Sequence, residues 1–243
     1  MKLGKLNTAI LIIILILVID QVSKFYIKTG FPTGHITNIL GMDWARIHFI
    51  ENSGMAWGWK FGNETGKTIL TLFRLAAVIF GSWLLVKFAR EKYTMGFMVC
   101  VALIYAGAMG NLIDSMFYGM IFDKGLHFDA AVIDPFTGKP GYYMGYDGVA
   151  QLTSGSGYSS FLHGSVVDML YFPMVRSTYP SWFPFVGGEP FEFFAPIFNV
   201  ADAAISTGVI TLLVFQKRFY RREGQIVDAP KTTDAQTSAA ANN

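Results

Sequence analysis

The sequence predicts an all-α membrane protein in which four transmembrane helices carry an extracytoplasmic β-rich cradle and an aromatic interfacial segment. Of the 243 residues, 52% are hydrophobic and only 15% are charged, whereas soluble domains average about 25% charged residues. Windows of about 20 apolar residues, the length that crosses a hydrocarbon core of roughly 30 Å, occur four times. They cover approximately residues 6–26, 68–88, 94–113 and 195–216.

The first apolar window has the features of a retained anchor rather than those of a cleaved signal peptide. It follows Lys2 and Lys5 and runs into Asp20 and Lys24 without a small-residue cleavage site. The third window contains Cys100, the single cysteine of the chain. We expect Cys100 to be a small core residue rather than part of a disulfide framework.

Lysine and arginine residues near the span ends predict the orientation, because short positively charged segments stay in the cytoplasm. Such residues flank the N-terminus, the turn between spans two and three, and the C-terminal end of the fourth span. Both termini are therefore expected inside, with residues 28–67 and 115–194 outside. The basic residues indicate topology and not a nucleic-acid surface. Residues 1–223 would form one membrane-embedded domain, and 224–243, which lack apolar periodicity, a disordered cytoplasmic tail.

The two long outer stretches differ in composition. Residues 116–160 are rich in Gly, Tyr, Asp and Ser, which favours turns and short strands outside the bilayer. Residues 171–198 are strongly aromatic and interrupted by proline, which favours a segment at the level of the lipid headgroups. No internal repeat of fixed period is visible, which weakens an interpretation as a transporter built from duplicated halves.

Polar residues within the apolar spans fall at one predicted depth. With a rise of 1.5 Å per residue, Asp20 lies roughly 21 Å along the first span and Asn111 about 26 Å along the third. Asp202 lies roughly 5 to 9 Å from the outer start of the fourth span, where Asn199 is a candidate N-cap. Ionisable groups in a membrane are costly and usually face a bundle interior with a partner. Their convergence predicts a shared polar site, and Asp20 with Lys24 is also expected to form an i,i+4 ion pair.

A pair of carboxylates at this depth would permit hydrolysis. Two acids at close range share one proton, because like charges a few Å apart do not both ionise cheaply. Such a pair can activate water without a covalent intermediate. Asp202 is the best single candidate, and depth alone leaves Asp20, Asp114 and Asp168 open as its partner. Arg74 in the second span either extends toward the interface or reaches the site, and the sequence does not choose between these positions.

Other kinds of chemistry find little support. Ser156 and His163 lie in a flexible Gly-Ser stretch that lacks the strained elbow of nucleophilic hydrolases. The histidines show no metal-ligand spacing, so neither a metal nor another cofactor is expected. Two further classes stay open: a non-enzymatic transporter or assembly factor whose acids brace the bundle, and a lipid-modifying transferase, although the acid-rich repeat expected of the latter is absent.

Four short stretches stand out in order along the chain. They are 20–24 (DQVSK), 52–58 (NSGMAWG), 107–114 (GAMGNLID), and the pair 163–168 (HGSVVD) with 198–202 (FNVAD). Together they resemble the lipoprotein signal peptidase family, also called signal peptidase II, over most of residues 6–216. The resemblance implies an intramembrane aspartic endopeptidase of the bacterial cytoplasmic (inner) membrane. It would remove signal peptides from diacylglyceryl-modified prolipoproteins by cutting before the lipidated cysteine.

The resemblance also implies which residues form the site near the outer membrane face. The catalytic pair falls on Asp168 and Asp202. The residues that support or line the site are Asp20, Lys24, Asn52, Gly54, Asn111, Asp114, Asn199 and Ala201. The expected partners are lipid-modified prolipoproteins and membrane lipid, and the chain is expected to be a monomer.

Two features depart from the family pattern. Ser115 follows Asp114, where family members commonly have arginine, and the sequence leaves open how this side of the site is braced and how the substrate backbone is held. The connection of 53 residues between Asp114 and Asp168 is also far longer than usual. The insertions 116–163 and 170–198 are expected to be either a lid that contacts substrate or a passive enlargement of the outer cradle.

Overall fold

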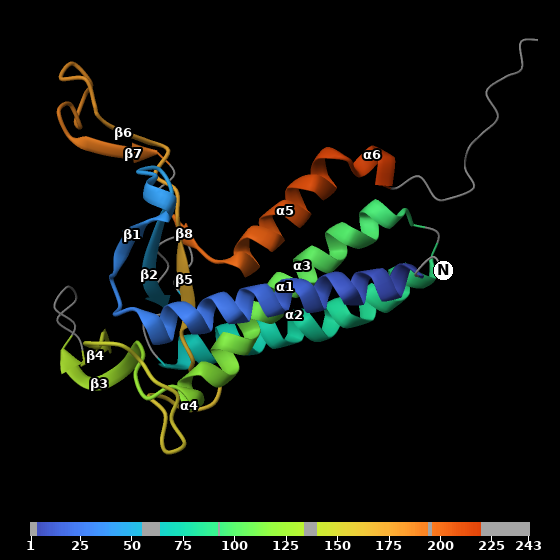
Figure 1. Cartoon of the computed structure of the whole chain (residues 1–243), viewed down its shortest axis with the longest axis horizontal. Coiled ribbons are helices and arrows are strands. Elements are labelled where there is room, and N and C mark those ends of the chain that lie inside the picture. Colours follow the sequence, from blue (N-terminus) through green and yellow to red (C-terminus); the bar gives the residue numbers. More distant parts are fainter. Residues whose placement is uncertain (1–3, 55–63, 92, 134–139, 194–195, 220–243) are drawn as a thin grey trace, which may run out of the picture.

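Apolar helices form a bundle, and small β-sheets lie at one end of it. The computed structural model describes residues 4–54, 64–91, 93–133, 140–193 and 196–219. Figure 1 shows the helices running along the long axis of the molecule, with the strands gathered at the end opposite the N-terminus. The expected disordered tail, 224–243, lies outside the described residues.

Three helices have the length and composition of membrane spans. They are α1 (Lys5–Gly30), α2 (Glu64–Arg90) and α3 (Met95–Ile113), and α3 continues through a π-helical turn, η2 (Asp114–Tyr118), into α4 (Gly119–Ile121). The first three expected spans are therefore confirmed as long apolar helices. Both α1 and α2 extend several residues beyond the apolar windows at the sheet end, which brings charged residues into helical positions there.

The fourth apolar segment is shorter than predicted. Helix α5 runs only over Val200–Val214 and is followed by the short α6 (Gln216–Phe219). Its 15 residues rise about 22 Å, which is less than the roughly 30 Å of a hydrocarbon core. The helix starts late because β8 (Ile197–Phe198) precedes it and Asn199 caps it. A fourth complete span over 195–216 thus stays a prediction.

The class is mixed helix and sheet, not all-α as expected. The main sheet is antiparallel with the order β1 (Ile36–Asn38), β2 (Arg46–Asn52), β5 (Val166–Tyr171) and β8. Two separate hairpins pair β3 (His127–Ile133) with β4 (Pro140–Met144), and β6 (Val175–Thr178) with β7 (Pro190–Phe193). The short 3₁₀ turn η1 (Ile39–Gly41) follows β1. These strands agree with the turn-rich composition of the long stretches, and their role as a cradle stays a prediction.

Glycines allow α3 to approach its neighbours closely. A Cβ atom on Gly107 would lie 2.2 Å from the carbonyl oxygen of Ala201 in α5. A Cβ atom on Gly110 would lie 2.6 Å from Oδ2 of Asp20 in α1. Small residues at such crossings let backbones pack tightly in a membrane. The same closeness brings the polar side chains of α1, α3 and α5 within hydrogen-bond distance.

Two hydrophobic clusters are separated along the molecule. One lies within the helix bundle and includes Phe97, Met98 and Cys100, so the expected core position of this cysteine is confirmed. The other lies where the sheet meets α1 and α4 and includes Phe49 and Tyr118. The outer surfaces of the helices carry many exposed large apolar side chains, as membrane spans do.

The insertion after α4 is attached to the sheet through Glu51 of β2. The Glu51 carboxylate pairs with the buried Lys28 of α1. It also accepts a hydrogen bond from the Tyr146 hydroxyl at 2.7 Å and one from the backbone N–H of Leu126 at 2.8 Å. The Lys28 ammonium lies 5.0 Å from the ring centre of Tyr158. Cation, carboxylate and aromatic rings therefore connect helix, sheet and insertion.

Candidate active site

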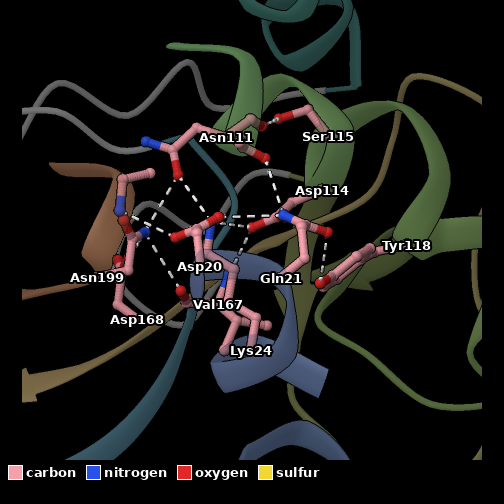
Figure 2. A network of polar contacts seen from close by, with 12 residues as sticks. Asp20, Gln21, Lys24, Asn111, Asp114, Ser115, Tyr118, Val167, Asp168 and Asn199 are labelled. Atoms are coloured by element: carbon pink, nitrogen blue, oxygen red, sulfur yellow. Dashed lines mark hydrogen bonds and ion pairs between the residues drawn. The ribbon is translucent and has the colours of Figure 1, made fainter. Parts of the chain in front are cut away.

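The polar residues predicted at one depth lie together in one network of hydrogen bonds and ion pairs (Figure 2). They come from α1, the C-terminal end of α3, β5 and the N-terminus of α5. Six of the predicted site residues with polar or charged side chains are buried: Asp20, Lys24, Asn111, Asp114, Asp168 and Asn199. Buried charges require partners, so the hydrogen bonds of each residue indicate what it can do.

Asp168 lies in β5, where its backbone pairs with Ile50 of β2, and its residue surface is only 3% exposed. Its Oδ1 accepts a hydrogen bond from Nδ2 of Asn199 at 2.7 Å, and its Oδ2 accepts one from Nδ2 of Asn52 at 3.4 Å. Burial, followed by the nearby charge of Asp202, raises the pKa of Asp168 to about 7. This carboxyl group can therefore hold a proton near neutral pH.

Asn199 links Asp168 to Asp202. As the N-cap of α5, Asn199 accepts a hydrogen bond at Oδ1 from the backbone N–H of Asp202 at 2.9 Å. In return, the backbone N–H of Asn199 donates to Oδ2 of Asp202 at 3.4 Å. This capping box holds Asp202 in the first turn of α5. A single buried side chain thus contacts an aspartate on a strand and the backbone of another on a helix.

Asn111 of α3 holds Asp202 from the opposite side. Its Nδ2 donates to Oδ1 of Asp202 at 2.8 Å. Its Oδ1 accepts hydrogen bonds from Nδ2 of Asn199 and from Nζ of Lys24, both at 3.1 Å. Because an amide both donates and accepts, Asn111 connects the two aspartates to the buried cation on α1.

Lys24 is fully buried, and its ammonium group reaches three acceptors. Nζ lies 2.9 Å from Oδ2 of Asp20, 2.8 Å from Oδ2 of Asp114 and 3.1 Å from Oδ1 of Asn111. The expected i,i+4 pair with Asp20 is confirmed, and Asp114 is a second acid on the same cation. Asp20 also accepts the backbone N–H of Ala201 at 2.9 Å. Both acids are thus occupied in joining helices.

Two members of the network are not among the predicted site residues. Gln21 donates from Nε2 to Oδ1 of Asp114 at 2.9 Å and accepts the Tyr118 hydroxyl at 3.1 Å. Gln21 lies in the stretch that carried the resemblance, so that stretch held a signal for it. Tyr118 lies in the π-helical turn η2, within the long insertion, where no sequence pattern pointed to it.

The Asn52–Gly54 turn closes another side of the site. Asn52 is the last residue of β2, and its Oδ1 accepts the backbone N–H of Gly54 at 2.9 Å. Gly54 has a φ of +106°, and a Cβ atom there would lie 2.5 Å from Cδ2 of Leu70. The positive φ favours glycine in this turn, and a larger residue would also require the Leu70 side chain to shift. The rest of the resembling stretch, 55–58, lies outside the described residues.

Arg74 points toward the site and not toward the interface, which answers a question that the sequence leaves open. Its Nη1 donates to Oγ of Ser115 at 2.7 Å. Ser115 in turn donates to the backbone carbonyl of Asn111 at 2.9 Å. The guanidinium group from α2 thus lies beside the position where related chains commonly carry arginine.

The histidine considered for a nucleophilic site has another role. Nε2 of His163 lies 2.8 Å from Oγ1 of Thr68, and Nδ1 lies 2.9 Å from Oγ of Ser160. These contacts fasten the loop before β5 onto α2. Among the described residues, no group of three or more His, Cys, Asp or Glu side chains is arranged to hold a metal ion.

The family match covers nearly all of the described chain. The sequence model of the family described as Signal peptidase (SPase) II matches residues 12–217. The chain belongs to this family. A lipoprotein signal peptidase of Porphyromonas gingivalis is 42% identical over 230 residues, which cover 94% of this chain and 89% of the relative. A lipoprotein signal peptidase of Amoebophilus asiaticus is 29% identical over 228 residues, covering 93% and 84%.

A solved structure was also found to be similar. It is a bacterial membrane enzyme determined by the in meso method at 2.3 Å resolution, with a TM-score of 0.49 and 22% sequence identity over 91% of this chain and 95% of that chain. Membership of the signal peptidase II family, together with the apolar helices, makes the chain a multi-pass bacterial membrane protease. The family membership favours a peptidase over the non-enzymatic and transferase alternatives.

Proposed function

We propose that this member of the signal peptidase II family is an aspartic endopeptidase that removes signal peptides from diacylglyceryl-modified prolipoproteins. Cleavage would occur just before the lipidated cysteine, and Asp168 with Asp202 would activate the attacking water. The observation that carries the proposal is the connection of these two aspartates through Asn199, with hydrogen bonds of 2.7 Å to Asp168 and 2.9 Å from the Asp202 backbone.

The proposed pair is chosen by the contacts of each acid. Asp20 and Asp114 are bound to Lys24, so their negative charge is balanced by a buried cation. Among the described residues, neither Asp168 nor Asp202 forms an ion pair, and their oxygen atoms accept hydrogen bonds from uncharged amides. Two such acids side by side are suited to share one proton.

The pKa of Asp168, raised to about 7, makes it the acid that holds the shared proton. The ionised Asp202 takes a proton from water while the oxygen of that water attacks the carbonyl carbon of the scissile bond. Protonated Asp168 donates its proton to the carbonyl oxygen, which produces a neutral tetrahedral diol. The C–N bond then breaks as the leaving nitrogen takes a proton from Asp202 and one diol hydroxyl gives its proton to Asp168. A carboxylic acid and an amine are released, the pair again holds one proton, and no covalent enzyme intermediate forms.

The lipidated substrate agrees with the surroundings of the pair. Apolar helix surfaces suited to lipid lie directly beside the polar network, so an acyl chain could stay in the bilayer while the peptide enters from the sheet end. We place the active site near the outer face of the cytoplasmic membrane, with both termini inside. Charge near the span ends supports this orientation.

A gel-shift assay with a diacylglyceryl prolipoprotein tests the proposal. Purified wild type, Asp168→Asn and Asp202→Asn are compared, with Asp147→Asn at an exposed position of the insertion as the control. We expect both site variants to lose processing while the control retains it and all unfold at similar temperatures. Processing at the wild-type rate by either site variant would rule out the aspartic mechanism.

A further inference from the structure

The polar network contains a second cation whose partners are only partly accounted for. Arg74 lies in α2, a helix long and apolar enough to cross a membrane. An arginine within such a helix is costly unless it faces a polar site. Its side chain donates to Oγ of Ser115 at 2.7 Å, which uses one of the five N–H groups of the guanidinium.

The charge of Arg74 interacts with both aspartates of the proposed catalytic pair. Its electrostatic partners are Asp114, then Asp202 and Asp168. Asp114 already has Lys24 as its cation at 2.8 Å. Neither aspartate of the pair has a cation within ion-pair distance among the described residues. The charge of Lys24 acts on Asp168 from a greater distance, and Arg74 is a cation whose charge interacts with both aspartates.

A count of the charges in the network also indicates that the aspartate pair needs a cation besides Lys24. The network holds four carboxyl groups, on Asp20, Asp114, Asp168 and Asp202, and Lys24 balances only part of their charge. With one proton shared by the pair, a single negative charge stays between Asp168 and Asp202. A cation a few Å away favours that ionised state.

We propose that Arg74 is a positioning residue that keeps one member of the Asp168–Asp202 pair ionised. It does so from α2, through a guanidinium group held by Ser115. This inference depends on the proposed function. It explains how a chain with serine at position 115 supplies positive charge to this side of the site: the cation comes from a different helix, and the small hydroxyl side chain leaves space for it.

The pH profile of kcat/KM tests this inference. The charged groups around the site are Lys24, Lys67, Arg74, Asp20, Asp114, Asp168 and Asp202, and Arg74→Gln changes only one of them. Loss of the cation makes the carboxylate harder to ionise, so we expect the acidic limb to move to higher pH by about one unit. On the acidic side of this limb, kcat/KM at a fixed pH should then be roughly tenfold lower than in the wild type. Lys87→Gln, at the other end of α2, is the matched control and should leave the profile unchanged.

A relocated charge separates this role from a merely structural one. In the double variant Arg74→Gln/Ser115→Arg, the cation returns to the same side of the site from α3, and we expect the acidic limb to move back toward the wild-type position. If Arg74→Gln does not fold, Ser115→Ala is used, since it removes the acceptor of the 2.7 Å hydrogen bond and should shift the limb in the same direction by a smaller amount.

The outcomes for the inference and for the proposed function differ. An unchanged pH profile in folded Arg74→Gln, or in folded Ser115→Ala where that variant is used, overturns the role of Arg74 and leaves the aspartate pair in place. Full activity in Asp168→Asn or Asp202→Asn instead overturns the proposed function itself.

Discussion

The side-chain amide of Asn199 donates to Oδ1 of Asp168 at 2.7 Å, although 30 residues separate the two positions in sequence. Asn199 is fully buried and caps α5. It thus has two functions: it satisfies the first turn of the helix that carries Asp202, and it fixes the direction of the carboxyl group on β5. Changes at this position should affect both stability and activity.

Asn199→Ala should cost about 1 kcal/mol of stability through the lost cap and leave Asp168 without its shortest hydrogen bond. We expect kcat to fall much more than KM changes, because the substitution alters the pair and not the substrate surface. Steady-state cleavage kinetics and thermal unfolding measure the two effects. Thr94→Ala, which removes the N-cap of α3, controls for the loss of a cap distant from the site. A similar loss of kcat in the control would contradict the specific role of Asn199.

Asp168 gives a pH dependence whose sign can be derived. Its pKa is about 7 in the folded protein and ordinarily 3.8, so between these pH values the folded state binds more protons than the unfolded state. The free energy of unfolding should therefore fall as pH rises from about 4 to about 7, by on the order of 4 kcal/mol at most. Asp168→Asn lacks this titration, so its stability should vary less with pH. Parallel stability curves for the two proteins would show that the group does not titrate in this window.

The same raised pKa predicts the alkaline limb of activity. Asp168 has to hold its proton to polarise the substrate carbonyl, and this form is lost as pH passes its pKa of about 7. We expect kcat/KM to decline above roughly neutral pH in the free enzyme. Measurement of kcat/KM over a pH series checks this, and a rate that keeps rising beyond pH 9 would exclude Asp168 as the proton donor.

Some parts of this arrangement follow from sequence and others depend on tertiary contacts. Apolar windows suffice to predict α1, α2 and α3, because the thickness of the bilayer dictates their length. The Asp20–Lys24 pair is predictable from i,i+4 spacing. The ion pair of Asp114 with the same lysine is not predictable from spacing, because it requires the close crossing of α1 and α3 that Gly110 permits.

The depth of each residue along its helix does not identify Asp168 as the partner of Asp202. Asp168 reaches the site through the antiparallel pairing of β2 with β5, whose register sets Asn52 opposite Val166. That pairing joins segments more than 100 residues apart, and a helical periodicity carries no information about it. The late start of α5 has a related cause, since β8 takes up residues that composition alone assigns to a helix.

The ion cluster around Lys24 should respond to single and multiple substitutions in opposite ways. Lys24→Met leaves Asp20 and Asp114 buried without a cation, which should destabilise the protein by about 3 to 5 kcal/mol. In the triple variant Lys24→Met/Asp20→Asn/Asp114→Asn, no uncompensated charge is left, and we expect much of the stability to return. Thermal unfolding in lipid nanodiscs measures both. A triple variant less stable than Lys24→Met would show that the cluster acts mainly through its hydrogen-bond geometry.

The β6–β7 hairpin projects away from the main sheet (Figure 1), and its tip exposes Trp182 at 78% and Phe185 fully. Phe185 also has a φ of +70°, a left-handed conformation that is unusual for an aromatic residue. Exposed aromatic rings are favoured at the lipid headgroup level, so we expect the tip to lie at the membrane surface. A variant that keeps Trp182 and replaces the other four tryptophans by phenylalanine should show fluorescence quenching by brominated lipids. The matched control moves the single tryptophan to position 147 on the other insertion, and equal quenching at both positions would contradict a specific contact of the hairpin with lipid.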